Sequence, residues 1–284
     1  MNNYATRKYS GEITARLACG IHERAEHEIH TENELFYLYE GTALIYSELG
    51  QETVSGGTLV VIPKGFYHRI AYDTSVSEPL RCTCHFDSLL GFDSLATDRL
   101  SAVRFINNEE IDKAFNGIRN IFSKSLDEMT EKALLKSYVG LTLAAIGKSN
   151  EGNVSSSPHN SIVKKTIEYI NKNISDDLTA DKIALALHVS ASYLRQLFRR
   201  EMSTPLHQYV LQKRLILANN KIMNSTPAVI AASECGFSDY SNFYTQYKKR
   251  FGVAPSMAKK QEILDKSLSY PTTFIDISNE ICLR

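Results

Sequence analysis

Hydrophobic and polar positions change their periodicity along the chain. Between residues 15 and 86, short apolar runs alternate with turn signals. The runs occupy residues 35–39, 43–46, 58–62 and 80–86, and the signals between them are Glu40-Gly41, Leu49-Gly50, Gly56-Gly57 and Pro63-Lys64-Gly65. Strands this short at this spacing predict a small sandwich or barrel.

A helical period replaces this pattern between residues 108 and 147. Ile111, Phe115, Ile118 and Phe122 form one apolar stripe, residues 134–143 hold a broader one, and Asp127 is a start signal between them. We therefore expect two antiparallel helices. Apolar surface left over after packing on the barrel needs cover, so these helices are expected to join two copies of the chain. The alternative is that both stripes are consumed inside the monomer.

The remaining pattern is a linker followed by helices. Residues 148–160 are polar, rich in serine, glycine and asparagine, and without periodicity. Thr204-Pro205 and Thr226-Pro227 each predict a threonine N-cap with proline at the first helical position, and Gly252 predicts a helix end. The helix over residues 205–223 would be a rod of roughly 28 Å. Such a rod can hold two recognition helices close to one DNA turn, about 34 Å, apart.

Composition excludes several classes of protein. The chain has 284 residues, of which 43% are hydrophobic and 23% are charged, as in a globular protein. No apolar run is long enough to span a bilayer and residues 1–11 lack a signal-peptide core, so we expect a cytoplasmic protein without a membrane partner. The 5 cysteines are scattered and form no Cys-x-x-Cys pair, which argues against a disulfide framework or structural zinc. Cys82 and Cys84 are expected to pack on one buried strand face.

The charge is unevenly distributed, although the formal net charge is zero. Residues 160–262 carry 15 lysines and arginines against 8 acidic residues, whereas residues 1–159 carry 15 against 21. A basic C-terminal part beside an acidic N-terminal part predicts that only the former meets a polyanion.

Two segments of the basic part resemble each other. The first runs over residues 183–200 and the second over 230–251. In each, a small alanine, Ala184 or Ala231, lets a first helix pack closely on a second. Ser190 and Ser238 are expected to cap the second helices and to leave backbone N–H groups free for phosphate. Both second helices end in basic residues, so the pattern predicts two helix-turn-helix units.

The second unit carries a family signature. The matching run consists of Ile230-Ala231, Gly236-Phe237-Ser238-Asp239, Phe243, Tyr247-Lys248-Lys249, Phe251-Gly252-Val253 and Pro255. It resembles the signature of the AraC family of transcription regulators, and the resemblance extends over residues 161–262. Tyr247 stands where phenylalanine is usual, Ala254 where threonine is usual, and His188 replaces the small turn residue of many helix-turn-helix units.

The outward faces of the two second helices are the expected DNA-reading surfaces. In the first unit, Leu194, Leu197 and Phe198 point inward, and by resemblance Ser192, Arg195 and Gln196 occupy base-reading positions. Arg195 could pair with guanine and Gln196 with adenine. The full expected set is Ser190, Ser192, Arg195, Gln196, Arg199, Ser238, Tyr240, Ser241, Tyr244, Thr245, Lys248 and Lys249, with the two lysines on phosphates.

The β-rich part resembles a cupin barrel, the usual sensor domain of this family. The residues that fit the two cupin patterns are His30, Glu34, Gly41, Gly57, Pro63, Gly65 and His68. Two positions depart from metal-binding cupins: Glu28 stands where they have a histidine, and Tyr72 where they often have asparagine.

These residues favour a polar effector pocket. The expected effector-binding residues are Glu28, His30, Glu34, Tyr37, His68 and His85. Such a lining suits a sugar or a similar hydroxylated metabolite, by analogy with the family. Glu28, His30, Glu34 and His68 could also hold Mn²⁺, Fe²⁺ or Zn²⁺, or could merely satisfy core hydrogen bonds. The favoured interpretation has neither metal nor another cofactor.

The predicted fold class is α+β with two domains. The expected boundaries are a cupin-like domain over residues 1–92, a helical dimerisation segment over 93–148, a linker over 149–160, an all-α double helix-turn-helix domain over 161–262, and a tail over 263–284. The predicted function is a homodimeric regulator, not an enzyme, that binds double-stranded DNA under control of a small-molecule effector and contacts RNA polymerase if it activates. The alternatives are a ligand-independent DNA-binding protein and a metal-dependent cupin enzyme with an appended DNA-binding module.

Overall fold

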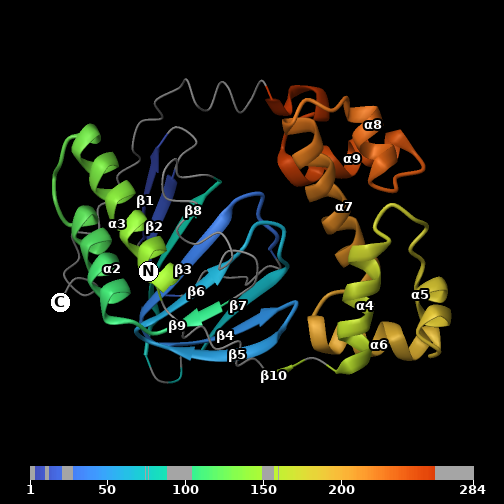
Figure 1. Ribbon diagram of the computed structural model, residues 1–284, viewed down its shortest axis with the longest axis horizontal. Coiled ribbons are helices and arrows are strands. Elements are labelled where there is room, and N and C mark those ends of the chain that lie inside the picture. The colour runs from blue at the N-terminus through green and yellow to red at the C-terminus, as the bar shows by residue number, and fades with distance from the viewer. Residues whose placement is uncertain are drawn as a thin grey trace.

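A computed structural model of the chain describes residues 4–9, 13–20, 28–73, 75, 77–87, 104–148, 157–158 and 160–259. Its N-terminal part contains two antiparallel sheets (Figure 1). The six-stranded sheet has the order β1 (Tyr4–Tyr9), β2 (Ile13–Cys19), β8 (Leu80–Phe86), β3 (Asn33–Glu40), β6 (Thr58–Ile62) and β9 (Arg104–Ile106). The four-stranded sheet has the order β10 (Ser157–Pro158), β5 (Gly50–Ser55), β4 (Thr42–Ser47) and β7 (His68–Asp73).

Strand alternation gives the six-stranded sheet two buried faces. Phe36 and Leu38 of β3 pack against Ile45 and Val54 of the other sheet, so this face lies inside the sandwich. The alternate residues of β3 lie in a second core, where they meet the helices that follow. The predicted barrel is therefore a barrel-like sandwich with open edges, and the predicted α+β class is confirmed.

Helices α2 (Glu109–Phe122) and α3 (Glu128–Lys148) form the predicted pair and cover the outer face of the six-stranded sheet (Figure 1). Asn108 caps α2 by accepting from two backbone N–H groups, and Asp127 accepts from the Thr130 N–H at the start of α3. Gly117 allows the close approach, because a Cβ there would lie 2.3 Å from the Tyr138 ring. Most of both apolar stripes is buried against the sheet. This agrees with the alternative in which the stripes are consumed inside the monomer, although Leu141 stays exposed.

Several strands of this part were not predicted. Strands β2, β5 and β7 match none of the predicted runs, and three other strands lie outside the predicted β-rich region. Strand β1 adds an edge to the sheet, and β9 lies inside the segment expected to be helical. Strand β10 belongs to the predicted linker but pairs with Gln51 and Gly50 of β5. Residues 149–156, and the tail over 263–284, lie outside the described residues.

The C-terminal part is all helical. Its elements are α4 (Ser161–Lys172), α5 (Ala180–Ala186), α6 (Ala191–Met202), α7 (Leu206–Met223), α8 (Ala228–Glu234), α9 (Tyr240–Phe251) and the 3₁₀ turn η2 (Pro255–Met257). One core unites α4, α5, α6 and the first half of α7, and another unites the second half of α7 with α8 and α9. The two predicted units therefore share α7, whose 18 residues give a length of about 27 Å.

The predicted helix ends are partly right. Gly252 ends α9 in the left-handed conformation with φ 76°, as expected for a glycine stop. The predicted threonine caps are wrong, because Pro205 and Pro227 themselves occupy the N-cap positions and neither makes a side-chain cap hydrogen bond. Their carbonyl oxygens accept the first intrahelical bonds, from Tyr209 and Ala231. Each helix thus begins one residue later than proline at the first helical position would require.

The helical domain lies on the opposite side of the sandwich from α2 and α3 (Figure 1). Ile29 and Tyr67 of the N-terminal part belong to the same buried cluster as Phe198 and Tyr209. Beside this cluster, the Lys213 Nζ atom lies 2.7 Å from a Glu48 carboxylate oxygen; the Glu48 side chain is buried and that of Lys213 is 12% exposed. The Lys213 ammonium also donates to the Gly65 carbonyl. A packed interface containing a buried ion pair therefore joins the two domains.

Within the described part of the chain, no helix combines the length and the apolar character needed to cross a membrane.

Candidate functional site

The first helix-turn-helix unit consists of α5, a turn over residues 187–189, and α6. Ser190 caps α6 as predicted, with its hydroxyl accepting from the Tyr193 N–H at 3.2 Å. His188 adopts the left-handed conformation, with φ 55°. The turn keeps the tight geometry usually given to a small residue, at a conformational cost on the order of 1 kcal/mol for an L side chain.

The second unit repeats this geometry with α8, a turn over residues 235–237, and α9. Gly236 holds the position equivalent to His188, with φ 81°. The predicted cap by Ser238 is wrong, because Asp239 caps α9 by accepting from the Ser241 and Asn242 N–H groups. Ser238 is exposed one residue before the cap. The carboxylate at Asp239 places negative charge where the first unit has a neutral hydroxyl.

The outer face of α6 presents the predicted DNA-reading residues. Leu194, Leu197 and Phe198 are buried, whereas Ser190, Ser192, Arg195, Gln196 and Arg199 are all exposed. Arg195 already has a partner in the structure, because its guanidinium donates to the Asp181 carboxylate of α5 at 2.9 Å. Exposed pairs of this kind contribute at most about 1 kcal/mol, so the pair can open when a base competes for the guanidinium.

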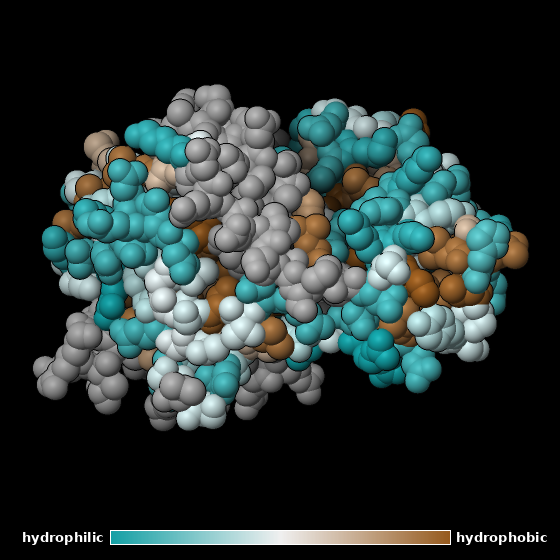
Figure 2. All heavy atoms as spheres, turned by 60° about the horizontal axis from the view of Figure 1, so that its bottom comes forward, coloured by the Kyte–Doolittle hydropathy of each residue, from teal (hydrophilic) through white to brown (hydrophobic). Residues whose placement is uncertain are grey.

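The outer face of α9 has a different character. Phe243 and Tyr247 are buried, and the exposed residues are Tyr240, Ser241, Tyr244, Thr245, Lys248 and Lys249. The Thr245 hydroxyl donates to the Ser241 carbonyl of its own helix, so this face offers fewer free donors than α6. On the face shown in Figure 2, the helical domain carries both hydrophilic and apolar surface.

Helix α7 fixes the two units relative to each other. Arg214 donates to the carbonyls of Ile174, Asp176 and Gly236, and so ties the loop before α5 to the turn of the second unit. A Cβ at Gly236 would lie 2.8 Å from the Arg214 guanidinium carbon. The Tyr247 hydroxyl donates a hydrogen bond to the Asn219 side chain of α7, so the tyrosine that stands where phenylalanine is usual has a partner. The two reading helices are therefore held on one rigid frame.

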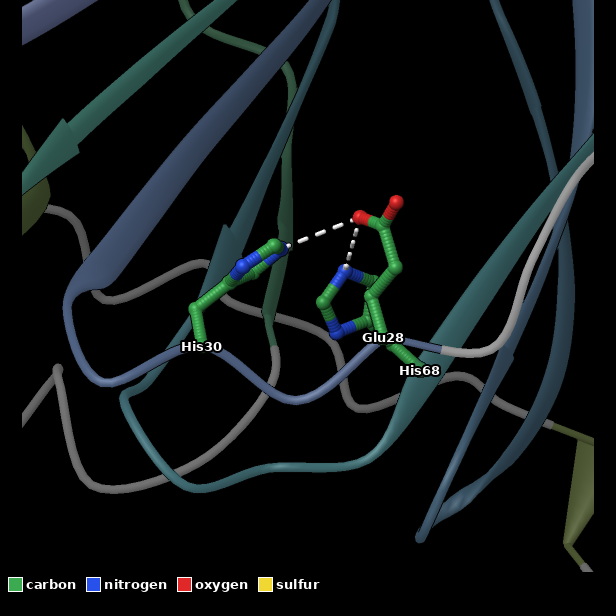
Figure 3. A group of neighbouring side chains, drawn as sticks. All are labelled: Glu28, His30 and His68. Carbon is green, nitrogen blue, oxygen red and sulfur yellow. Dashed lines mark ion pairs between the residues drawn. The ribbon is translucent and has the colours of Figure 1, made fainter. Parts of the chain in front are cut away.

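A second candidate site lies inside the sandwich, where five polar side chains meet. Glu34 comes from β3, His68 from β7 and His85 from β8, while Glu28 and His30 precede β3. Figure 3 shows the side chains of Glu28, His30 and His68 pointing towards one another. Backbone hydrogen bonds in both directions between Glu28 and His68 bring the leading segment to β7. The sequence thus predicted this group correctly apart from one member, Tyr37.

One Glu34 carboxylate oxygen is the centre of this group. It lies 3.1 Å from His30 Nε2, 3.2 Å from His68 Nε2 and 3.6 Å from His85 Nε2. The Glu28 carboxylate lies 3.1 Å from the same His30 nitrogen. Glu34 and His68 are almost fully buried, and Glu28 is the most exposed member.

The charges in the group reinforce one another. Burial raises the pKa of the Glu34 carboxyl, but the three imidazoles outweigh it and hold that pKa well below its usual value. Burial lowers the pKa of His30, yet the two carboxylates overcome this effect and raise it to about 10. His30 also holds the pKa of Glu28 below its ordinary value. Imidazole nitrogens and carboxylate oxygens in this arrangement could bind a hydroxylated ligand or a transition-metal ion.

Tyr37 was wrongly placed at this site. On β3 it alternates with Glu34 and Phe36, so its ring faces the helices. There it stacks on Phe115, with the two ring centroids 4.5 Å apart. Its hydroxyl donates to Asp112 of α2 at 2.7 Å. The aromatic residue near the group is Tyr72, and the guanidinium of Arg81 lies 4.4 Å from its ring centroid.

The chain is similar to several known proteins. Residues 183–261 match a family described as "Helix-turn-helix domain". An uncharacterized HTH-type transcriptional regulator of Escherichia coli, YdiP, is 24% identical over 252 residues, which cover 83% of this chain and 81% of that protein. The regulatory protein PocR of Salmonella typhimurium is 29% identical over 111 residues, which cover 39% of this chain and 36% of that protein. The structure of a transcriptional regulator (AraC-type DNA-binding domain-containing proteins) from Chromobacterium violaceum is 27% identical, covers 36% of this chain and 91% of that chain, and has a TM-score of 0.33.

Residues 183–261 are an AraC-type helix-turn-helix domain, and the relatives are transcriptional regulators that carry such a domain. The predictions of a DNA-binding regulator and of a protein that is not an enzyme are confirmed. The match to PocR spans only about a third of that protein, whereas the match to YdiP covers most of both chains.

Three residues of structural importance escaped the sequence analysis. Asp181 holds Arg195, Arg214 braces the two units, and Arg81 is a buried cation inside the sandwich that donates to the Gly20 carbonyl. Only Arg81 had a signal, because it alternates with the core residues Leu80 and Cys82 on a strand. The partners of the other two lie too far along the chain for a pattern to reveal them.

Proposed function

We propose that a small molecule bound inside the sandwich controls how this regulator engages DNA. The observation that carries the proposal is the polar group around Glu34, where His30, His68 and His85 each bury an Nε2 atom that makes no hydrogen bond in the described structure. Buried polar atoms that lack a hydrogen bond are costly, and a bound ligand would satisfy them. A hydroxylated effector such as a sugar offers both donors and acceptors to such a group.

The two reading helices are proposed to have different tasks. Arg195 and Gln196 of α6 can make bidentate contacts with guanine and adenine, and Ser192 completes that face. Arg199, Lys248 and Lys249 meet phosphates, while Tyr240, Ser241, Tyr244 and Thr245 give α9 a weaker sequence preference. Ser190 and Ser238 lie where the helix N-termini approach the backbone of the DNA. The first unit therefore provides most of the specificity.

The domain interface is the proposed route from effector to DNA. His68 of the polar group follows Tyr67, which packs on Tyr209 of α7 with ring centroids 5.4 Å apart. His30 follows Ile29, whose carbonyl accepts from Arg250 of α9 at 2.7 Å. A ligand that shifts either segment changes contacts to the frame that carries both reading helices. The effector then changes DNA affinity if it binds the form with docked domains and the form with released domains with different affinities.

We also propose that the regulator works as a homodimer through α3. Leu134 and Tyr138 are half-buried and Leu141 is 59% exposed, and the three residues follow one another along one face of the helix. Pairing this strip with a second copy would complete its burial. Leu141→Glu should convert a dimer to a monomer in sedimentation at tens of micromolar, and a wild-type monomer would refute the proposal.

The effector proposal is tested by thermal unfolding of the full-length chain against a panel of sugars. A ligand at 100 times its Kd stabilises the folded state by about 2.7 kcal/mol and raises Tm by several degrees. The shift should vanish in His85→Ala and persist in His207→Ala, since His207 is exposed on α7 and far from the polar group in sequence. A flat panel would refute a sugar effector, and an equal shift in His85→Ala would place the ligand elsewhere. A true effector must also change affinity for an operator.

A further inference from the structure

We propose that His30, Glu34, His68 and His85 bind one first-row divalent metal ion, with Glu28 as a further, more exposed ligand. The proposal concerns the same residues as the effector site, but it stands on the geometry of their donor atoms alone. It adds a metal ion to the pocket that the sequence predicted without one. It also adds His85, which neither cupin pattern contains.

The separations of the donor atoms are those of ligands on a single ion. Two atoms bound at about 2.1 Å, with an angle between 90° and 120° at the metal, are about 3.0–3.6 Å apart. The three histidine nitrogens lie 3.1, 3.2 and 3.6 Å from the same Glu34 oxygen. Donor atoms of Glu28, His30 and His68, and likewise those of His30, Glu34 and His85, lie within 4.8 Å of one another.

Hydrogen bonding does not account for this convergence. A carboxylate oxygen has two lone pairs and cannot accept from three imidazoles at once. The Nε2 atoms of His30, His68 and His85 and the Oε2 atom of Glu34 are all buried without a hydrogen bond in the described structure. Side-chain exposure is 3% for Glu34 and 1% for His68, so water does not readily satisfy them. One cation at the point of convergence would satisfy all four atoms.

The surroundings prepare the ligands for a metal. His68 directs its other ring nitrogen, Nδ1, towards the Phe66 carbonyl at 3.3 Å, and this contact orients the ring so that Nε2 is aimed at the group. Glu34, His68 and His85 come from three strands and are therefore held rigidly. Figure 3 shows Glu28 reaching over His30 and His68 from the leading segment. Nitrogen and carboxylate ligands together select Zn²⁺, Fe²⁺ or Mn²⁺ over Mg²⁺ or Ca²⁺.

The metal ligands alternate with residues of the domain interface. Ile29 lies between Glu28 and His30, and Tyr67 precedes His68; both neighbours are buried against the helical domain. An ion that joins these two segments therefore also fixes the surface on which α7 and α9 rest. Metal occupancy should consequently change DNA affinity, and the effect should depend on the Lys213–Glu48 contact of the same interface.

The test uses untagged, full-length protein. Metal-stripped wild-type chain is titrated with Zn²⁺ by calorimetry and with Co²⁺ by visible absorption, and the expected stoichiometry is one ion per chain. Glu34→Gln should weaken Zn²⁺ binding by more than about 100-fold, because changes that only reorient a ligand already cost 10–100-fold. The matched control His207→Ala removes an exposed histidine of α7 and should bind Zn²⁺ like the wild type.

A measurement without substitutions covers the case in which Glu34→Gln fails to fold. Zn²⁺ should raise the Tm of the stripped wild-type chain in a saturable manner, and Mg²⁺ should not. No binding at micromolar Zn²⁺, or equal affinity in Glu34→Gln and the wild type, overturns the metal site. If Zn²⁺ binds but leaves operator affinity unchanged, or changes it equally in the wild type and Lys213→Met, the coupling to the interface is wrong. In that case the metal site itself stands.

Discussion

Lys213→Met tests whether the two domains are docked as the structure describes. The Lys213 ammonium loses two contacts on substitution, the Glu48 carboxylate at 2.7 Å and the Gly65 carbonyl at 3.0 Å. Lys213 is 12% exposed and Glu48 is 5% exposed, so the substitution leaves a buried carboxylate without its counter-ion. Glu48 retains the Tyr67 N–H and the neighbouring Tyr209 hydroxyl, neither of which carries a positive charge. Breaking a buried pair in this way costs about 3–5 kcal/mol.

This cost should largely disappear when both partners are replaced. In Lys213→Met with Glu48→Gln, no charge is buried, and the glutamine oxygen can still accept from Tyr67. The remaining loss should be about 1 kcal/mol, the usual contribution of a hydrogen bond. The difference corresponds to a coupling free energy of about 2 kcal/mol or more, as expected for residues in direct contact.

Urea unfolding of the full-length chain, followed by far-UV circular dichroism, measures these effects. With an m value of about 1.5 kcal/mol/M, a loss of 3 kcal/mol lowers the first unfolding midpoint by about 2 M. Lys221→Met is the matched control, because Lys221 lies on the same helix and pairs with Glu234 at 2.6 Å, but in solvent. That control should show no measurable change. If Lys213→Met behaves like Lys221→Met, or if the double variant loses as much as the single, the docked interface is not formed in solution.

Three further substitutions test the DNA-reading domain. Arg195→Ala should weaken operator binding by about 1–3 kcal/mol and relax specificity at one base pair, and an equal loss on random DNA would make it a phosphate contact instead. Lys248→Ala should weaken binding to every sequence alike and lower the salt slope by about 0.9, whereas a sequence-dependent loss would contradict a phosphate contact. His188→Gly should raise the free energy of unfolding by about 0.5–1 kcal/mol in thermal denaturation, because glycine adopts the φ of 55° without strain, and a destabilised variant would refute the proposed turn.

Periodicity predicted those elements whose stability comes from local pattern. The α2 and α3 stripes, the α7 rod and both helix-turn-helix units follow from apolar spacing, and Ser190 and Gly252 fulfil their expected terminal roles. Helix starts were less accurate. Asp239 displaced Ser238 as a cap because two adjacent residues can both accept from the first turn, and sequence alone does not decide between them.

The polar group in the sandwich could be predicted from the sequence only in part. Motif spacing grouped Glu28, His30, Glu34 and His68, and the structure places His85, which was named outside the motifs, beside them. Spacing could not tell which face of β3 was which, because both faces of that strand are buried and its apolar residues therefore do not alternate with polar ones. Tyr37 was consequently assigned to the wrong side. The Lys213–Glu48 pair was invisible for another reason: its partners belong to different domains, and only tertiary structure brings them together.

The central claim, that α6 and α9 read DNA as two units on one frame, is tested most directly by hydroxyl-radical footprinting on a selected operator. The 18-residue α7 predicts two protected segments about one helical turn apart, or roughly 10 base pairs. Arg195→Ala should lose base preference in one segment and leave the other protected with unchanged preference. A single protected segment, or an equal loss of preference in both, would contradict the account.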